Sequence, residues 1–459
     1  MNKLKPNKLW IIYGIVFAAY ICIAVFAGIH HEPWSDEAQS WLIARDSNTL
    51  TDIFKAVRYE GTLPTWHLII KAFQIFGLDY GHIFVIPLIF TAVGVLLLFC
   101  TDAPLLAKVM LPFSFFVVFQ NTVVARQYSL VFPAMMLIVI FYKKRFEVPV
   151  RYHLALFFLA MTSSYGVIVT CSFMLWDFIG MVRKRFNDPL YKKTIIPFFA
   201  TGLVIAVLSY LSLPPDDCSG IVNKLPFAKN AVNALLFSIE NKAVQYIVLA
   251  LFLGLLAYYF RRNLLQALIL IAPLVVFMIV VYQRPWHMTY LFFLAVSLMI
   301  IFRDDFNKWT KPVGKTGNLS ANVIVTALLT VQCFTGFYSV YYDYRNTYSP
   351  AKDVAAFLEP YVEKGVVLNR VGYNSIAVSP YFDHSVFAND TCGVTYYIWS
   401  YNVPNGDLSE EWPDVLLTYR YYDRFDNADY EVHRFDSHMT FKMDTVEAVP
   451  YIVYVKKGI

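Results

Sequence analysis

Charge is scarce in this sequence. Aspartate, glutamate, lysine and arginine make up 15% of its 459 residues, whereas a soluble domain carries about 25%. The net charge of +5 is small and scattered along the chain, so a nucleic-acid partner is not expected. The chain also has no CxxC pair and no glycine-rich phosphate loop, so two common sequence signals for metal and nucleotide sites are missing.

Hydrophobic residues take the place of the missing charge. They form 58% of the chain, and aromatic residues alone form 17%. A helix needs about 20 apolar residues to cross a bilayer, and the candidate runs are 9–29, 62–78, 82–100, 105–124, 127–142, 152–163, 165–181, 194–213, 243–260, 263–282, 287–302 and 318–342. We therefore predict a mainly α, polytopic membrane bundle over residues 1–344, with about 11–13 crossings. The first run is expected to be retained, since no small-residue cleavage site follows it.

Basic residues indicate which ends of these runs face the cytoplasm. They gather at the N-terminus and at 143–145, 183–193, 261–262 and 303–315. The segments that would then face outside are 30–61, 214–242, 283–286 and everything after residue 343. One conflict remains, because four apolar runs lie between residues 61 and 143, where an odd number of crossings is required. Either one of the four is interfacial or re-entrant, or one crossing has been counted as two.

Residues 345–459 differ from the rest, because none of their apolar runs is long enough to span a bilayer. Ser349-Pro350 precedes a predicted helix over 351–362 with proline in its first turn. Short runs rich in β-branched and aromatic residues predict strands at 366–368, 395–399, 415–421 and 451–455. We expect a small mixed α/β domain on the extracytoplasmic side.

The first external loop, 30–61, is acidic and holds an Asp36-Glu37 pair. Ser35 is predicted to cap a helix that begins at Asp36. The helix would present an apolar face (Ala38, Trp41, Leu42 and Ile43) to the membrane surface. Carboxylates in the first turn of a helix are favoured by its dipole. The pair therefore has a purely structural explanation as well as a catalytic one.

This loop also carries the most specific string in the chain. Residues 34–45 read W-S-D-E-A-Q-S-W-L-I-A-R and resemble the string W-x-D-E-A-Q-A-W-x-x-A-R of membrane-embedded GT-C glycosyltransferases. The resemblance is to bacterial members of glycosyltransferase family 39, the protein O-mannosyltransferase and aminoarabinose-transferase group. Residues 58–66 resemble that family's R-Y-E-G-H-P-P-L-W but depart at Thr62, Leu63 and Thr65, so the family's usual histidine is missing. Looser likenesses follow in order at 125–130, 163–166, 213–217 and 284–287.

The resemblance implies transfer of a sugar from a polyprenyl-phosphate donor to an acceptor hydroxyl at the outer face of a bacterial cell membrane. A carboxylate near the acceptor can act as general base, and arginine can neutralise the departing phosphate. By this analogy Asp36 is the catalytic base, and Glu37 orients the acceptor or helps to hold a cation. The residues expected to bind substrate are Glu60, Arg126, Tyr128, Arg284 and His287. Asp46, outside the pair, is expected to tolerate replacement by asparagine.

Several alternatives stay open. Glu60 and His287 are candidate ligands of a divalent metal ion, whereas each arginine has the alternative explanation of snorkelling to the membrane interface. The acceptor is a cell-envelope glycan, a glycolipid or a protein. Cys218 and Cys392 both fall on the predicted oxidising side and are candidates for a disulfide.

The chief rival function is a polytopic transporter or lipid flippase without transferase activity. Transporters tend to show internal repeats and charges inside their spans. No repeat is detectable in this chain, and most of its charges lie in loops. A second rival is a scaffold that displays the C-terminal domain, for which an Asp-Glu loop with aromatic flanks would be unnecessary.

Overall fold

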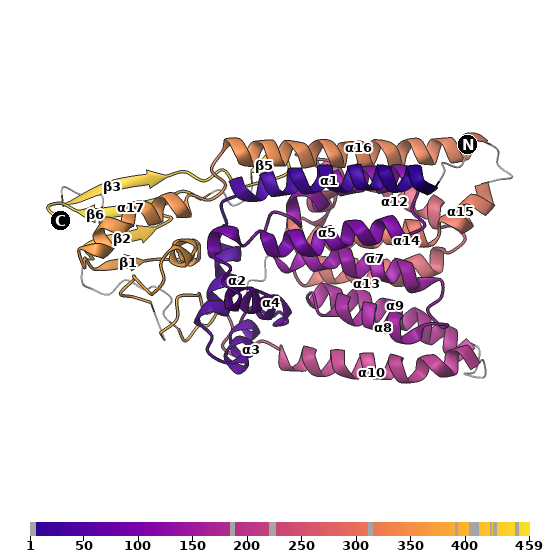
Figure 1. Ribbon diagram of the computed structural model, residues 1–459, viewed down its shortest axis with the longest axis horizontal. Helices are drawn as coiled ribbons and strands as arrows, with labels where there is room; N and C mark the ends of the chain where they lie inside the picture. Colours follow the sequence, from indigo (N-terminus) through magenta and orange to yellow (C-terminus); the bar gives the residue numbers. More distant parts are fainter. Residues whose placement is uncertain are drawn as a thin grey trace.

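The computed structural model describes residues 6–183, 189–219, 226–310, 315–390, 393–403, 413–422, 425, 429–445 and 449–459. The molecule is elongated, with a bundle of helices along most of its length and a small sheet at one end (Figure 1). The prediction of a mainly helical chain with an α/β region near its C-terminus is confirmed.

Most bundle helices run along the long axis of the molecule (Figure 1). They are α1 (Pro6–His30), α5 (Val85–Cys100), α7 (Val131–Tyr142), α8 (Pro149–Ala160), α9 (Ser164–Arg183), α10 (Pro189–Leu211), α12 (Lys242–Phe260), α13 (Leu264–Val280), α14 (Met288–Ile301) and α16 (Lys315–Arg345). Shorter helices are α6 (Leu105–Met110), α11 (Phe227–Leu235) and α15 (Arg303–Thr310). Among the described residues, six helical segments are long and apolar enough to cross a membrane.

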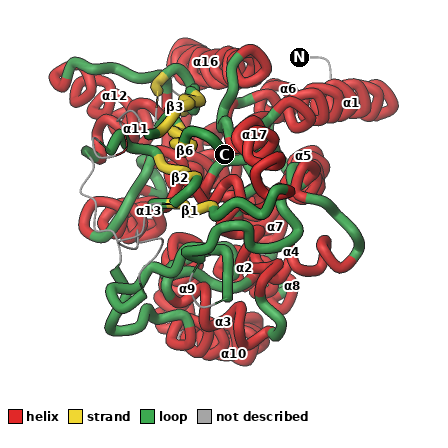
Figure 2. Tube along the Cα trace, turned by 90° about the vertical axis from the view of Figure 1, so that its left-hand side faces the viewer, coloured by secondary structure: helices red, strands yellow, loops and turns green. Residues whose placement is uncertain are grey.

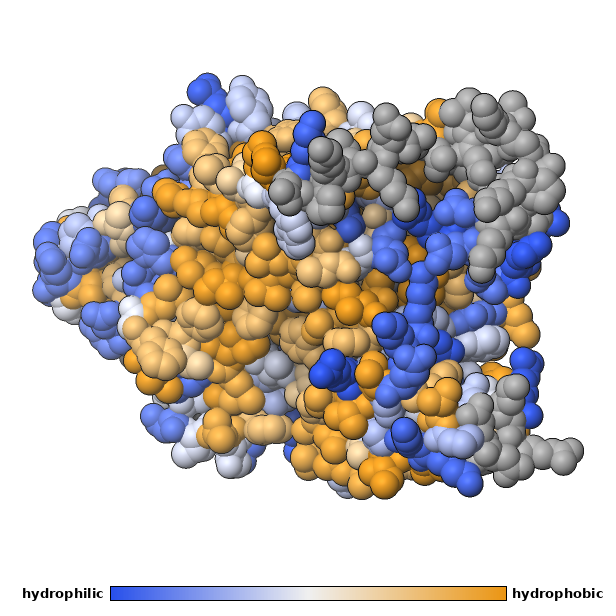
Figure 3. Space-filling model, turned by 45° about the vertical axis from the view of Figure 1, so that its right-hand side comes forward, coloured by the Kyte–Doolittle hydropathy of each residue, from blue (hydrophilic) through white to orange (hydrophobic). Residues whose placement is uncertain are grey.

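The outer faces of these helices are apolar. Ile196 of α10 is 80% exposed and Leu251 of α12 is 69% exposed. Figure 3 shows the apolar surface as a broad orange band over the helices, with hydrophilic residues towards the end that carries the sheet. A soluble protein rarely exposes a continuous apolar surface of this size. The band therefore fits a protein that is surrounded by lipid.

One of the four apolar runs between residues 61 and 143 forms a short helix outside the bundle. Helices α2 (Ser35–Asp46), α3 (Leu50–Arg58) and α4 (Thr65–Ile75) gather between the bundle and the sheet (Figure 1). Helix α4 has 11 residues and is roughly 16 Å long, about half the thickness of a bilayer core. Without α4, three apolar runs separate residue 61 from residue 143, which is an odd number.

The C-terminal domain is built on a four-stranded sheet with the order β1-β2-β6-β3. Its elements are α17 (Ala351–Glu363), β1 (Leu368–Arg370), the 3₁₀ segment η6 (Tyr373–Tyr381), β2 (Val415–Thr418), β3 (Tyr430–Phe435) and β6 (Tyr451–Lys456). Strands β1 and β2 are parallel and the other pairs are antiparallel. The sheet lies over the end of the helical bundle (Figure 2).

The predicted helix and the strand at 451–455 are confirmed. Strand β2 begins at 415 as predicted but ends at Thr418 instead of 421, and β1 begins two residues later than expected. The strand predicted at 395–399 is wrong, because that segment joins no sheet. Strand β3 was not foreseen. It lies at the edge of the sheet, and most of its side chains are at least partly exposed. Edge strands tolerate polar residues, which removes the alternating apolar pattern that would have revealed it.

A small hairpin, β4 (Thr440–Phe441) and β5 (Asp444–Thr445), joins the C-terminal domain to the bundle. Lys442 at its turn is fully buried and has a φ of 59°. Its Nζ donates to the carbonyls of Asn233 (2.7 Å) and Ala234 (2.6 Å), at the end of α11. The carbonyls at a helix C-terminus lack partners within the helix and carry partial negative charge. Lys442 therefore links the C-terminal domain to the helical bundle by hydrogen bonds.

Candidate active site

The start of α2 directs its two acidic side chains to different places, because successive residues on a helix point about 100° apart. Asp36 faces a cavity, whereas Glu37 points into the protein and is fully buried. Glu37 Oε1 accepts from the backbone amide of Ala125 (2.5 Å), and Oε2 accepts from the amide of Trp34 (3.1 Å). Glu37 thus holds the residue before Arg126 against α2. This place suits a positioning residue better than the expected contact with acceptor or cation.

Two expectations for α2 are wrong. The helix begins at Ser35 with Trp34 in the N-cap position, and Ser35 Oγ donates to Asn374 Oδ1 (3.3 Å) instead of capping. The helix also does not present its apolar face to the membrane surface. Its apolar residues are buried in cores shared with α3, α4 and η6, because the C-terminal domain covers the face that the amphipathic pattern assigns to lipid.

Asp36 joins the bundle to the C-terminal domain. Its Oδ2 lies 3.3 Å from Arg126 Nη2, and its Oδ1 accepts from Tyr373 Oη (2.7 Å). Burial and the neighbouring Asp36 carboxylate raise the pKa of Tyr373 well above its usual value. The phenol therefore stays protonated and can donate a hydrogen bond to Asp36. A carboxylate has about four acceptor positions. Asp36 therefore retains capacity for a substrate hydroxyl.

Arg126 also has unused capacity. Its Nη1 donates to the carbonyl of Asp36 (2.5 Å), but its Nε is buried and has no hydrogen-bond partner within the described ranges. A buried donor without a partner costs free energy and calls for an explanation. Carboxylate and phosphate oxygens are the partners with which a guanidinium forms its strongest hydrogen bonds.

These groups open onto one cavity of about 470 Å³, within the range of roughly 300–1,000 Å³ typical of small-molecule sites. Its lining residues are Asp36, Tyr59, Glu60, Gly61, Thr62, Arg126, Gln127, Tyr128, Ser163, Ser164, Tyr165, Pro214, Cys218, Phe277, Val281, Tyr282, Trp286, His287, Tyr373 and Trp399. The cavity thus brings together Asp36, Glu60, Arg126, Tyr128 and His287 of the predicted residues. Glu37 and Arg284 are not part of its lining.

The lining also draws on every string that carries the family resemblance. The strings at 34–45, 58–66, 125–130, 163–166, 213–217 and 284–287 are far apart in the sequence, yet each contributes at least one lining residue. Arg284 lies behind the lining, where its Nε is 3.4 Å from Tyr282 Oη and its backbone amide donates to His287 Nδ1 (3.0 Å).

Glu60 is the second carboxylate of the cavity. It lies 3.5 Å from Nε2 of His67, which is fully buried. Burial alone would raise the pKa of Glu60, but the contacts with His67 and the charge of Arg126 outweigh it and lower the pKa below the usual value. Glu60 is therefore ionised at neutral pH and can accept hydrogen bonds from substrate hydroxyls.

The predicted metal ligands, Glu60 and His287, line the same cavity. His287 Nδ1 accepts from the Arg284 amide, which leaves Nε2 to carry the proton of a neutral ring. Among the residues that the structure describes, no group of three or more His, Cys, Asp and Glu side chains is placed to hold a metal ion. A metal on two protein ligands stays a prediction, and no catalytic step below depends on it.

His31, which directly follows α1, lies between two buried carboxylates. Its Nε2 lies 3.2 Å from Glu37 Oε2, and its Nδ1 lies 3.0 Å from Asp343 Oδ2 near the end of α16. Burial opposes the charged imidazolium, but the two carboxylates outweigh it and raise the pKa of His31 to about 10. Sequence reasoning missed this cluster because His31 and Asp343 are 312 positions apart.

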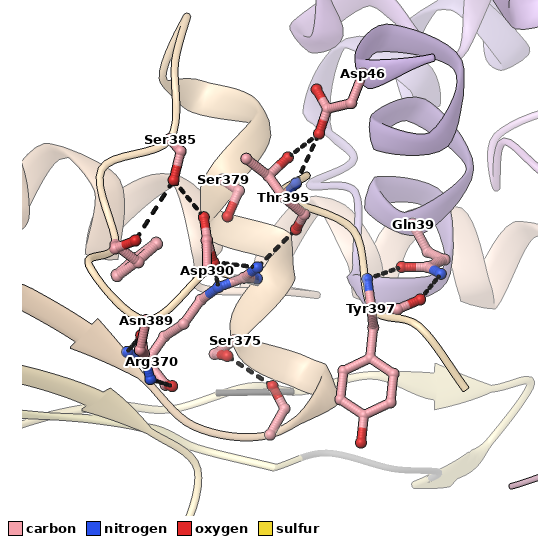
Figure 4. Close-up of polar contacts among 12 residues, drawn as sticks. Gln39, Asp46, Arg370, Ser375, Ser379, Ser385, Asn389, Asp390, Thr395 and Tyr397 are labelled. Carbon is pink, nitrogen blue, oxygen red and sulfur yellow. Dashed lines mark hydrogen bonds and ion pairs between the residues drawn. The ribbon is translucent and has the colours of Figure 1, made fainter. Parts of the chain in front are cut away.

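Two other residues of α2, Gln39 and Asp46, contact residues 395–397 of the C-terminal domain (Figure 4). Asp46 Oδ2 accepts from the backbone amide (2.7 Å) and Oγ1 (2.6 Å) of Thr395. Gln39 exchanges two hydrogen bonds with the backbone of Tyr397, at 2.7 and 2.9 Å. Asp46 therefore helps to hold the C-terminal domain on α2, and the expectation that its replacement by asparagine matters little for transfer stays a prediction.

Cys218 lines the cavity, and its Sγ lies 3.4 Å from the carbonyl oxygen of Tyr59. Cys218 is a free cysteine in this structure, which does not bear out the predicted disulfide with Cys392, a residue outside the described ranges.

No family model matches the chain, and neither a curated protein nor a solved structure matches it. The likeness to GT-C glycosyltransferases accordingly rests on the strings themselves and on their common place around one cavity.

Proposed function

We propose that the protein is a GT-C-like membrane glycosyltransferase, which moves a sugar from a polyprenyl-phosphate donor to an acceptor hydroxyl. The observation that carries this proposal is the Asp36–Arg126 pair, which places a carboxylate and a guanidinium in the lining of one cavity. The reaction needs both, because one substrate loses a proton while the other releases a phosphate.

The chemistry follows from these positions. The acceptor hydroxyl donates a hydrogen bond to Asp36, which takes its proton as the hydroxyl oxygen attacks the anomeric carbon of the donor. The bond between that carbon and the phosphate oxygen breaks, and its electron pair leaves with the polyprenyl phosphate. Arg126 stabilises the charge on the departing phosphate. Glu37 acts indirectly, by holding Asp36 and the segment before Arg126 together.

A transfer assay tests the proposal directly. The full-length protein, reconstituted in lipid vesicles, is incubated with radiolabelled polyprenyl-phosphate sugars and an extract of bacterial envelope glycans, lipids and proteins. We expect release of polyprenyl phosphate together with label in one acceptor fraction. Movement of intact donor across the vesicle membrane without cleavage would favour the transporter or flippase alternative and contradict the proposal.

We further propose that the cavity and the C-terminal domain face the extracytoplasmic side of a bacterial cell membrane. The support is the charge pattern: basic residues such as Lys143 and Arg145 lie in the loop after α7, and the first loop and the C-terminal domain follow helix ends on the opposite side. Positively charged loops are retained in the cytoplasm.

Labelling of single cysteines tests this orientation. In a cysteine-free background, Tyr401→Cys places a thiol in the C-terminal domain, where Tyr401 is 78% exposed. Arg262→Cys places one in the exposed loop between α12 and α13. A membrane-impermeant maleimide should label Tyr401→Cys in intact cells and Arg262→Cys only after permeabilisation. The reverse pattern would overturn the proposed orientation.

A further inference from the structure

The cavity has two walls of different origin. Residues of the bundle form one wall, among them Arg126, Tyr128 and His287, and Tyr373 and Trp399 of the C-terminal domain form part of the other. Asp36 contacts both sides, through Arg126 on one and Tyr373 on the other. A base between two walls is placed to serve two substrates, one on each wall.

The C-terminal wall is an aromatic cluster. Trp399 packs against Tyr373 with ring centroids 4.9 Å apart and against Tyr397 at 4.8 Å. All three rings are only partly buried. The face of an aromatic ring is electronegative, whereas the axial C–H groups of a pyranose ring carry partial positive charge. A sugar can therefore stack on such a face while its hydroxyl groups remain free at the ring edge.

The segment that carries this cluster is held in place although it belongs to no sheet. Asp46 and Gln39 bind its beginning, as described above (Figure 4). Asp217 binds its end, where it accepts from Ser400 Oγ (2.5 Å) and Asn402 Nδ2 (3.4 Å). These polar contacts fix the positions of the rings before a ligand binds. Such preorganisation lowers the entropic cost of binding.

We infer that Tyr373 and Trp399 form a subsite for a saccharide acceptor, in which a pyranose ring stacks on Trp399 and presents a hydroxyl to Asp36. This inference rests on the proposed transferase function and names its acceptor class. Hydroxyl partners are at hand beside the rings, since Glu60 and Tyr59 line the same cavity. An acyl chain would leave these polar groups without partners, and that cost disfavours a purely apolar occupant.

The test measures binding of chitotetraose, cellotetraose and mannotetraose to the full-length protein in lipid nanodiscs, by saturation-transfer NMR and calorimetry. We expect saturable binding of at least one tetrasaccharide. Trp399→Leu should weaken that binding about tenfold, because it removes the stacking face, and Trp399→Phe should restore part of it. The matched control is Trp10→Leu, since Trp10 is 63% exposed on α1, away from the cavity, and its loss should leave binding unchanged.

Each other outcome counts against the subsite. Absence of saturable binding by all three probes would overturn it, as would equal binding by wild type and Trp399→Leu. If Trp399→Leu does not fold, the comparison of Trp399→Phe with wild type takes its place, and unchanged affinity there would also overturn it. Transfer to a peptide or lipid at an unchanged rate in Trp399→Leu would refute the subsite and leave the transferase standing. Saccharide binding at Trp399 without any donor cleavage would support the subsite and contradict the transferase.

Discussion

Asp36→Asn is expected to lower the rate of sugar transfer by about 10²–10⁴-fold, the usual cost of losing a general base. The amide has nearly the same shape as the carboxylate. Its oxygen can accept from Arg126 and its NH2 group can donate to the Tyr373 hydroxyl, and these two residues lie 3.3 and 2.7 Å from Asp36. The fold and donor binding should therefore survive. The measurement is the initial transfer rate of variant protein that elutes as a single folded species.

The control for this variant is Asp79→Asn. Asp79 lies between α4 and α5, its side chain is 67% exposed, and it caps the turn at His82. Asparagine caps a helix about as well as aspartate, so this variant should keep the wild-type rate. Asp36 also stands in the first turn of a helix, where a purely structural role would make Asn harmless. Near-normal transfer by Asp36→Asn would therefore remove Asp36 from the mechanism.

His31→Leu is expected to destabilise the folded protein by about 3–5 kcal/mol, because it leaves two buried carboxylates without their shared cation. The side chains of Glu37 and Asp343 are at most 2% exposed, so neither reaches water. The damage should extend to the active site, since Glu37 also holds Asp36 in place. The measurement is the unfolding midpoint in detergent, with His82→Leu as a control on an exposed histidine, which should barely change it.

A double variant and the pH dependence separate this electrostatic effect from lost packing. Adding Asp343→Asn to His31→Leu removes one of the two uncompensated charges and should recover part of the stability, a coupling that independent sites would not show. The pKa of His31 is raised from 6.5 to about 10 in the folded protein. Its stabilising contribution is therefore fully present below about pH 6.5 and is lost as pH rises through about 10. A gap between wild type and His31→Leu that stays constant from pH 6 to pH 10 would contradict this assignment.

The sequence by itself determined the class of protein and the most specific part of its site. Long apolar runs can be counted without a structure, because the bilayer sets the length of a crossing helix. The string at 34–45 singled out Asp36, and the string at 125–130 singled out Arg126, and the structure places the two 3.3 Å apart. The helix at 351–362 was likewise predictable, because its proline and its apolar spacing are local signals.

Only the tertiary structure decided how these pieces meet. Tyr373 hydrogen-bonds to Asp36 across 337 positions of sequence, and no local pattern encodes such a distance. The contact between His31 and Asp343 is likewise not encoded locally. Nor is the contact in which the Gln39 side chain, instead of a neighbouring strand, accepts the hydrogen bond of the Tyr397 amide. Adjacent residues with the same chemistry also took different places, since Asp36 faces the cavity and Glu37 is buried. Propensity and periodicity act over a few residues, whereas the packing of α2 between the bundle and the C-terminal domain determines which side chains reach the cavity.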